Sequence, residues 1–400
     1  LSSAASDVYK RQVMRYVKKA VPKYSFAKST SFKRALKAGA GEKLKDVDIG
    51  FADIAYLQYT GGTTGVSKGA MLSHRNMVYN VQQTMTWQGG VYDDIDQVVA
   101  ITALPLYHIF SLEGNCLTGM ALGGENVLIT NPRDFEGFAK EISTHKFNLF
   151  TGVNTIFASL MNTPGFDKID FSHLKVSIGG GMAVQPAIAK EWKQKTGQPI
   201  LQGYGLTETS PVAICCRVGD DFTGTIGLPV PSTEVMIAGD DGNALALGEI
   251  GEICIKGPQV MEGYWQRPQD TAEVMLPGGW LRTGDVGRMD EDGFVWIEDR
   301  KKDMILVSGF NVYPNEIENV VVELDGILEA AAIGIADERS GEVVKIFAVR
   351  KDEATTEQDV IDHCRENLTG YKRPKFVEFR DELPKTNVGK ILRRELRDET

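Results

Sequence analysis

Short apolar runs alternate with amphipathic stretches through the middle of the chain. The runs expected as strands are residues 98–107, 126–130, 148–153 and 174–181, and the stretches expected as helices are one that follows Asn115, residues 136–145 and residues 155–161. Strands that alternate with helices predict βαβ units and a largely parallel sheet. Ligands bind at the carboxyl ends of such strands, which is where Thr151, Gly152 and residues 179–181 fall.

The pattern changes after residue 224. Short alternating segments separated by Asp-Gly and other turn pairs predict a β-rich subdomain over residues 224–299. The charged run 299–303 then precedes a strand, a helix, two more strands and a helix near 357–368, which is typical of a compact α+β unit. We therefore expect an α/β large domain over residues 13–299, a hinge at 300–302 and a small domain over 303–400.

A glycine-rich and hydroxyl-rich loop spans residues 59–69, after an apolar run that predicts a buried strand. In a Walker phosphate loop the lysine follows a glycine and opens a helix, whereas Lys68 lies three residues after Gly65 and the predicted helix N-cap, Ser73, comes later. We expect the loop itself to hold phosphate groups. Its candidate donors are Thr60, Gly61, Gly62, Thr63, Thr64, Gly65, Ser67 and Lys68.

Composition narrows the classes of function. A net charge of -10 over 400 residues argues against a nucleic-acid-binding surface. The five cysteines form no C-x-x-C pair and the histidines no H-E-x-x-H motif, so we expect no zinc site and a reducing, cytoplasmic location. No apolar run approaches the roughly 18 residues of a membrane span, although contact with a membrane surface stays open.

Six ordered blocks resemble the adenylate-forming acyl-CoA synthetases, and are most similar to bacterial long-chain fatty acid–CoA ligases. The blocks are Y-T-G-G-T-T-G-V-S-K-G (59–69), L-P-L-Y-H (104–108), G-Y-G-L-T-E (203–208), W-L-R-T-G-D (280–285), D-R-K-K-D (299–303) and P-K-T-N-V-G-K (384–390). The resemblance implies a partial α/β adenylation domain followed by a small, mobile α+β domain. It also implies a two-step reaction: a fatty acid attacks ATP with Mg²⁺ to give acyl-AMP and pyrophosphate, and coenzyme A then displaces AMP.

The resemblance also assigns roles in the large domain. Tyr204 would offer a flat face to adenine, Thr207 a hydroxyl near the α-phosphate, and Glu208, with Thr60, oxygen ligands for Mg²⁺. Asp285, at the presumed end of a strand, would accept both ribose hydroxyls, with Arg300 beside it. His108, also at a presumed strand end, would shape the acyl pocket and respond to ATP. The glycines expected to line the nucleotide are Gly181, Gly203 and Gly205.

Lys390 is the residue expected to act in adenylation, because a long cationic side chain on a glycine-flexed loop stabilises charge that the transition state redistributes. The small domain carries this lysine, so catalysis requires both domains to meet. The resemblance places the hinge at Lys302. It implies that rotation there withdraws the lysine and brings Ser308, Gly309 and Phe310 toward the site as a coenzyme A channel.

Alternatives stay open at this point. A ligase for medium-chain, aryl or amino acids, or one that loads a carrier protein, would share the core blocks, and only the acyl pocket near 108–120, 151–157 and 179–183 would differ. A nucleotide-binding fragment without turnover is the second alternative. Residues 1–12 resemble a translated adapter, so we expect a non-native leader on a chain that lacks the family's N-terminal segment. A Walker-type NTPase ranks lowest because Lys68 is misplaced.

Overall fold

The computed structural model describes residues 12–20, 25–60, 67–386 and 388–400. The chain divides into a unit over residues 1–49 and a unit over residues 50–400. In the first unit, the described helical elements are a π-helical turn, η1 (Val13–Val17), and α2 (Phe32–Gly39). The Ser31 hydroxyl caps α2 by accepting a hydrogen bond from the Arg34 amide. Neither element buries a residue.

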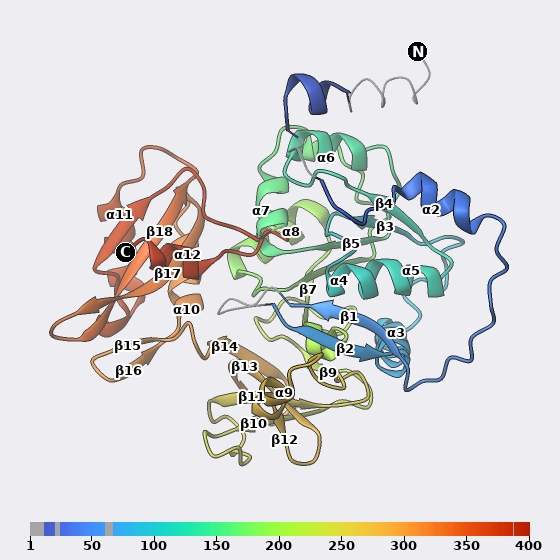
Figure 1. The fold of residues 1–400 in the computed structure, drawn as a ribbon. Coiled ribbons are helices and arrows are strands. Elements are labelled where there is room, and N and C mark those ends of the chain that lie inside the picture. The colour runs from blue at the N-terminus through green and yellow to red at the C-terminus, as the bar shows by residue number, and fades with distance from the viewer. Residues whose placement is uncertain (1–11, 21–24, 61–66, 387) are drawn as a thin grey trace. The chain divides into compact units, whose positions relative to one another are not determined.

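A seven-stranded sheet forms the centre of the second unit (Figure 1). In spatial order its strands are β4 (Glu125–Leu128), β3 (Val99–Thr102), β5 (Leu149–Gly152), β6 (Val176–Gly180), β7 (Ile200–Gly205), β8 (Val212–Cys215) and β9 (Leu228–Pro229). The five strands from β4 to β7 are parallel, and β8 and β9 are antiparallel to their neighbours. The predicted parallel sheet is confirmed, and its carboxyl ends include Gly152 and Gly180.

Helices cover this sheet and bury its apolar side chains. The helices α6 (Phe135–Ile142), α7 (Asn154–Met161) and α8 (Pro186–Thr196) share one aromatic core with β5, in which Phe138, Phe157 and Trp192 pack around Phe150. A short 3₁₀ turn, η3 (Phe166–Lys168), completes this layer. The two predicted helices over 136–145 and 155–161 are confirmed.

The helix expected after Asn115 begins earlier than predicted. It is a run of α4 (Ile109–Ser111), the π-helical η2 (Leu112–Leu117) and α5 (Thr118–Ala121). The amide of Phe110 donates to His108 Nδ1 at 3.4 Å, so His108 caps the helix start. His108 therefore precedes a helix and does not end a strand, because β3 already stops at Thr102.

The glycine-rich loop joins two antiparallel strands, β1 (Ile54–Tyr59) and β2 (Gly69–Ser73). The helix α3 (His74–Gln88) follows directly. Ser73 is its N-cap, as the sequence predicts, and it forms a capping box with Asn76. The prediction that the first strand is buried is wrong: Ile54 and Leu57 are each 41% exposed. The reason is that, among the described residues, β1 pairs only with β2.

The β-rich subdomain is confirmed as a five-stranded antiparallel sheet. Its strands are β10 (Glu234–Ala238), β11 (Gly251–Lys256), β13 (Trp280–Met289) and β12 (Met275–Leu276) in order, with β14 (Val295–Arg300) paired to β13; a helix, α9 (Pro268–Val274), precedes β12. The register of β13 and β14 sets Asp285 opposite Arg300. Strand pairing thus brings together two residues that belong to different sequence blocks.

The last hundred residues form an α+β arrangement with its own apolar core. Its sheet has the order β16 (Phe310–Val312), β15 (Ile305–Val307), β18 (Gly341–Arg350) and β17 (Ile327–Asp337), with β19 (Phe376–Phe379) parallel to β18; its helical elements are α10 (Pro314–Val322), α11 (Glu357–Asn367), η5 (Gly370–Lys372) and α12 (Arg393–Asp398). The predicted α+β unit is confirmed. In the described part of the chain, no helix is long and apolar enough to cross a membrane.

Candidate active site

A cavity with two lobes gathers most of the predicted site residues. The smaller lobe has a volume of about 460 Å³ and is lined mainly by polar side chains near Asp285, and the larger has about 900 Å³ and a more apolar wall. The two lobes share the residues Gly181, Gly203, Tyr204, Gly205, Arg300, Lys302, Lys390, Ile391 and Leu392. The larger lobe adds Thr60, Lys68, His108, Thr207 and Glu208. All six sequence blocks therefore contribute residues to the cavity. The block W-L-R-T-G-D contributes Thr283 and Asp285.

Asp285 is fixed from two sides at the smaller lobe. Its Oδ2 accepts a hydrogen bond from the Tyr204 hydroxyl at 2.8 Å, and its Oδ1 lies 3.3 Å from Arg300 Nε. Burial, and secondly Asp285 itself, raises the pKa of Tyr204 well above its ordinary value, so the hydroxyl stays protonated and donates. The prediction that Asp285 ends a strand is wrong, because pairing with β14 continues β13 to Met289.

Some of the phosphate-loop candidates lie outside the described residues, and the others are described. Gly61, Gly62, Thr63, Thr64 and Gly65 lie outside the described residues, and Ser67, at the loop's base, lines neither lobe. The ends of the loop are joined, because the Thr60 amide donates to the Lys68 carbonyl at 2.9 Å.

The Lys68 ammonium pairs with Asp270 of α9 and lies 5.1 Å above the Tyr264 ring. It enters a strand and not a helix. The strand that follows Lys68 separates this loop from a Walker motif, in which the lysine opens a helix.

Glu208 belongs to a short 3₁₀ turn, η4 (Thr207–Thr209), and shares the larger lobe with Thr60. Its Oε1 accepts a hydrogen bond from the Tyr264 hydroxyl at 2.6 Å, which orients the carboxylate. A Mg²⁺ ion usually takes one or two carboxylates and fills its octahedron with substrate phosphates and water. Glu208 and Thr60, which both line the larger lobe, offer oxygen donors of the kind that such an ion takes.

Lys390 enters this cavity on a tight loop. The Thr386 amide donates to the Lys390 carbonyl at 2.8 Å, and the Gly389 carbonyl accepts from the Thr155 hydroxyl of α7 at 3.1 Å. Burial first, and then the Arg300 guanidinium, lower the pKa of the Lys390 ammonium to about 7, although Asp285 acts in the opposite direction. Burial and the charge of Lys390 also lower the pKa of His108. The lysine, the ribose candidates and His108 therefore lie in one electrostatic environment.

The three residues predicted for the coenzyme A channel lie away from the cavity. Ser308 and Gly309, both with positive φ, form the turn between β15 and β16, and Phe310 is 56% exposed and stacks on Tyr371 at 4.6 Å. None of the three lines either lobe. Lys302 lines both lobes, and burial, followed by Arg300, lowers its pKa.

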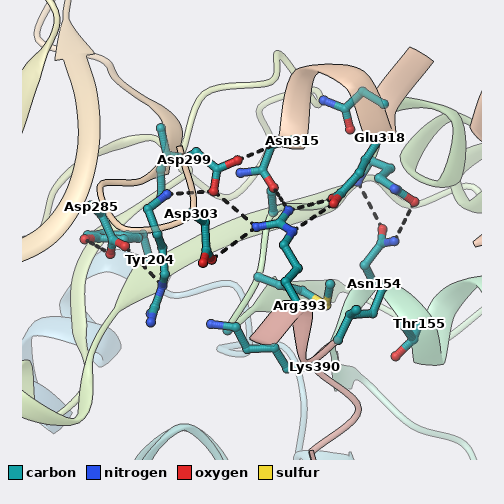
Figure 2. A pocket seen from close by; sticks show the side chains of 18 of the residues that line it. Asn154, Thr155, Tyr204, Asp285, Asp299, Asp303, Asn315, Glu318, Lys390 and Arg393 are labelled. Atoms are coloured by element: carbon teal, nitrogen blue, oxygen red, sulfur yellow. Dashed lines mark hydrogen bonds and ion pairs between the residues drawn. The ribbon is translucent and has the colours of Figure 1, made fainter. Parts of the chain in front are cut away.

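The sequence did not identify two features of the cavity. The wall of the larger lobe includes Thr84, Trp87 and Gln88 of α3 and Cys215 of β8. The helical spacing of the three α3 residues was a usable signal, because positions i, i+3 and i+4 share a face. The second feature is Arg393, which lies among acidic side chains beside Lys390 (Figure 2).

Comparison with known families agrees with this geometry. A model of the AMP-binding enzyme matches residues 4–265, and a model of the AMP-binding enzyme C-terminal domain matches residues 316–390. The chain belongs to the AMP-binding enzyme family. Its large α/β and small α+β parts are those of the adenylate-forming superfamily.

Relatives in this family are similar over nearly the whole chain. It is 54% identical over 398 residues to a long-chain-fatty-acid–CoA ligase of Salmonella typhimurium, covering 99% of this chain and 71% of the relative. The ligase of the same name from Haemophilus influenzae is 53% identical over 390 residues, covering 97% and 69%.

Solved structures of AMP-binding enzymes share the fold. ATP-bound MatB from Rhodopseudomonas palustris aligns with a TM-score of 0.82 at 32% identity, over 92% of this chain and 72% of MatB. The anthranilate CoA ligase AuaEII in complex with anthranoyl-AMP aligns with a TM-score of 0.82 at 30% identity, over 89% and 69%.

Proposed function

We propose that this AMP-binding enzyme activates a long-chain fatty acid in two steps. The carboxylate attacks the α-phosphorus of ATP, forming acyl-AMP and releasing pyrophosphate, and the coenzyme A thiol then attacks the acyl carbon, forming acyl-CoA and releasing AMP. The observation that carries the proposal is the convergence of Lys390, the Asp285–Arg300 pair and a large, mainly apolar lobe in one cavity. The names of the relatives supply the substrate class.

The smaller lobe suits the nucleoside. Asp285 lines this lobe and is held by Tyr204 and Arg300, and its two carboxylate oxygens match the two ribose hydroxyls. Gly181, Gly203 and Gly205 let the adenine approach the backbone closely, and Gly181 has a φ of +77° that favours glycine.

The phosphates extend into the larger lobe. Thr60, Thr207 and Lys68 line it there, and the ion pair of Lys68 with Asp270 keeps the ammonium at the lobe until phosphate replaces the carboxylate. Glu208 and Thr60 would hold Mg²⁺, which, when bound, neutralises phosphate charge. Ser67 and the glycines of the loop supply further donors in this proposal.

Lys390 lowers the barrier to adenylation by placing a positive charge where the carboxylate and the α-phosphate would otherwise repel each other. His108, whose pKa is lowered by burial and by Lys390, lines the larger lobe. It orders the wall of the lobe, and no proton transfer is assigned to it. The second step uses the hinge at Lys302, and Ser308, Gly309 and Phe310 then line the path of coenzyme A.

The larger lobe favours a long acyl chain over an aryl or amino acid. Its apolar wall includes Leu104, Ile109, Val212 and Val230, which suits a hydrocarbon chain. The pocket thus favours the fatty-acid reading over the aryl and amino-acid ligases that share the core blocks.

Fatty-acid-dependent exchange between ATP and labelled pyrophosphate tests the proposal. We expect exchange with palmitate, AMP and not ADP as the nucleotide product, and acyl-CoA only after coenzyme A is added. Exchange driven by benzoate or amino acids and absent with fatty acids would reassign the substrate. A chain that binds ATP and shows no exchange with any acid would be a nucleotide-binding fragment.

A further inference from the structure

Arg393 is fully engaged three residues after Lys390. Its Nε and Nη2 bind the two oxygens of Glu318 at 2.8 and 2.7 Å, and its Nη2 also donates to Asn315 Oδ1 at 2.7 Å. Its Nη1 donates to Asp299 at 3.2 Å and approaches Asp303 at 3.5 Å. All three guanidinium nitrogens thus have acidic or amide partners, as Figure 2 shows.

These partners come from three different segments. Glu318 and Asn315 belong to α10, Asp299 lies near the end of β14, and Asp303 follows Lys302. The segments are also bound to one another, because the Asn315 amide donates to Asp299 Oδ2 at 2.8 Å and its side chain donates to the Glu298 carbonyl at 3.1 Å. Arg393 therefore sits where the β-rich sheet, the predicted hinge and α10 join.

The cluster depends on the charge of Arg393. Asp299 is 1% exposed, and burial raises its pKa to about 6 although Arg393 acts in the opposite direction. Glu318 is buried as well, and its Oε1 also accepts the Ala332 amide at 2.8 Å. Buried carboxylates that lose the cation they pair with are strongly disfavoured, so Asp299 and Glu318 hold Arg393 in place.

The lysine loop is attached at both ends. Thr155 binds the Gly389 carbonyl on one side of Lys390, and Arg393 binds Asp299 on the other. A long side chain such as lysine has several rotatable bonds, so the position of its ammonium depends on how firmly its backbone is held. Two anchors on either side of Lys390 supply that restraint.

We propose that Arg393 is a positioning residue for the adenylation step, which holds the backbone of Lys390 at the cavity through its ion pair with Asp299. The inference rests on the proposed function, because it assigns Lys390 to acyl-AMP formation. Arg393 touches no substrate in this account. It acts only through the lysine.

Two half-reactions measured on the full chain test this role. Fatty-acid-dependent ATP–pyrophosphate exchange reports acyl-AMP formation, and acyl-CoA formation from supplied palmitoyl-AMP reports the second step. Arg393→Met leaves the buried carboxylates of Asp299 and Glu318 without the cation they pair with, and risks loss of the fold. Asp299→Asn keeps the cation, removes the ion pair on which the proposal rests, and is therefore the decisive variant.

In folded Asp299→Asn we expect exchange to fall about tenfold to a hundredfold, the range that small misplacements of catalytic groups produce. Acyl-CoA formation from palmitoyl-AMP should stay within about threefold of the unaltered chain. Arg393→Lys, which keeps the charge and loses the fork, should show the same split. Lys372→Gln is the matched control, because it breaks the 2.7 Å ion pair with Glu316, a residue of α10 that is not among the partners of Arg393, and should change neither half-reaction.

Equal losses in both half-reactions, or unchanged exchange in a folded Asp299→Asn chain, would overturn the positioning role. A similar split in Lys372→Gln would also overturn it, since any weakening of α10 would then suffice. Absence of exchange in the unaltered chain would instead refute the proposed function, so the two failures are distinguishable.

Discussion

The hydroxyl of Tyr204 and the carboxylate of Asp285 meet across two sheets at 2.8 Å. Tyr204 lies on β7 of the seven-stranded sheet and Asp285 on β13 of the five-stranded sheet. The hydrogen bond therefore joins the parallel core to the β-rich subdomain at the smaller lobe. The ribose site that we propose thus needs both sheets.

Tyr204→Phe should weaken ATP binding more than it slows chemistry. A hydrogen bond to a charged group is worth about 1.5–3 kcal/mol, so we expect KM for ATP to rise at least about tenfold while kcat changes by less than about threefold. Steady-state exchange over a range of ATP concentrations measures both constants. An unchanged KM in a chain with an unchanged melting temperature would refute the ribose assignment of Asp285.

Lys390→Met should separate the two half-reactions. Loss of a preorganised charge at the transition state commonly costs about 10²–10³-fold, so exchange should fall by that factor while acyl-CoA forms normally from supplied acyl-AMP. Lys375→Met is the control, because Lys375 pairs with Asp337 on the surface at 2.7 Å. If both half-reactions declined in parallel, Lys390 would be structural.

The pH dependence of adenylation should carry the signature of Lys390. The charged ammonium is the active form, and burial lowers its pKa to about 7, so kcat/KM for ATP should decline as the pH rises through about 7. The groups that tune this value are Arg300 and Arg393, which lower it, and Asp285 and Asp303, which raise it. In Lys390→Arg the decline should disappear, because a guanidinium stays protonated.

The same lowered pKa has an opposite effect on stability. The unfolded chain binds this proton more tightly than the folded chain, so the contribution of Lys390 to the free energy of unfolding rises between pH about 7 and the ordinary lysine pKa of about 10.4. Urea unfolding of the unaltered chain and of Lys390→Met at pH 7 and pH 9 should show the difference shrinking at the higher pH. A difference independent of pH would show that the ammonium is not desolvated in the folded state.

Cys215→Phe should shorten the accepted acyl chain. Cys215 lines the larger lobe from β8, and a phenyl ring there would occupy part of the volume of about 900 Å³. We expect kcat/KM for palmitate to fall more than about tenfold, with octanoate changed by less than about threefold. Equal losses for the two acids would indicate that the acyl chain does not reach this wall.

The sequence predicted the fold well where local signals and pairing agree. The parallel sheet follows from alternating apolar runs, and the start of α3 follows from Ser73, whose capping box needs no distant contact. The prediction that the strand at residues 54–59 is buried was wrong, because apolar content does not reveal how many neighbouring strands a strand has. The prediction that Asp285 ends a strand was wrong, because the glycine before it suggested a turn. Only the pairing with β14 continues the strand past Asp285.

The candidate site was predicted by its motif blocks, and Arg393 was not. In a run such as Lys-Ile-Leu-Arg-Arg-Glu-Leu-Arg, a basic residue ordinarily faces solvent. What distinguishes Arg393 is the convergence of Asp299, Asp303 and Glu318, which lie between 75 and 94 residues away in the sequence. No local pattern carries that information.

Gly389 limits how the chain can vary. Its φ is +83°, and a Cβ there would lie 2.9 Å from Thr155 Oγ1 and 3.2 Å from Val153 Cγ2. Any other residue would push the loop away from α7 and take Lys390 with it, while the rest of the fold would be undisturbed. Selection for thermal stability alone would therefore overlook this position. A substitution of Gly389 would be scored as harmless in a mutational library that measures protein abundance. The same substitution would be lost from a library that measures acyl-AMP formation.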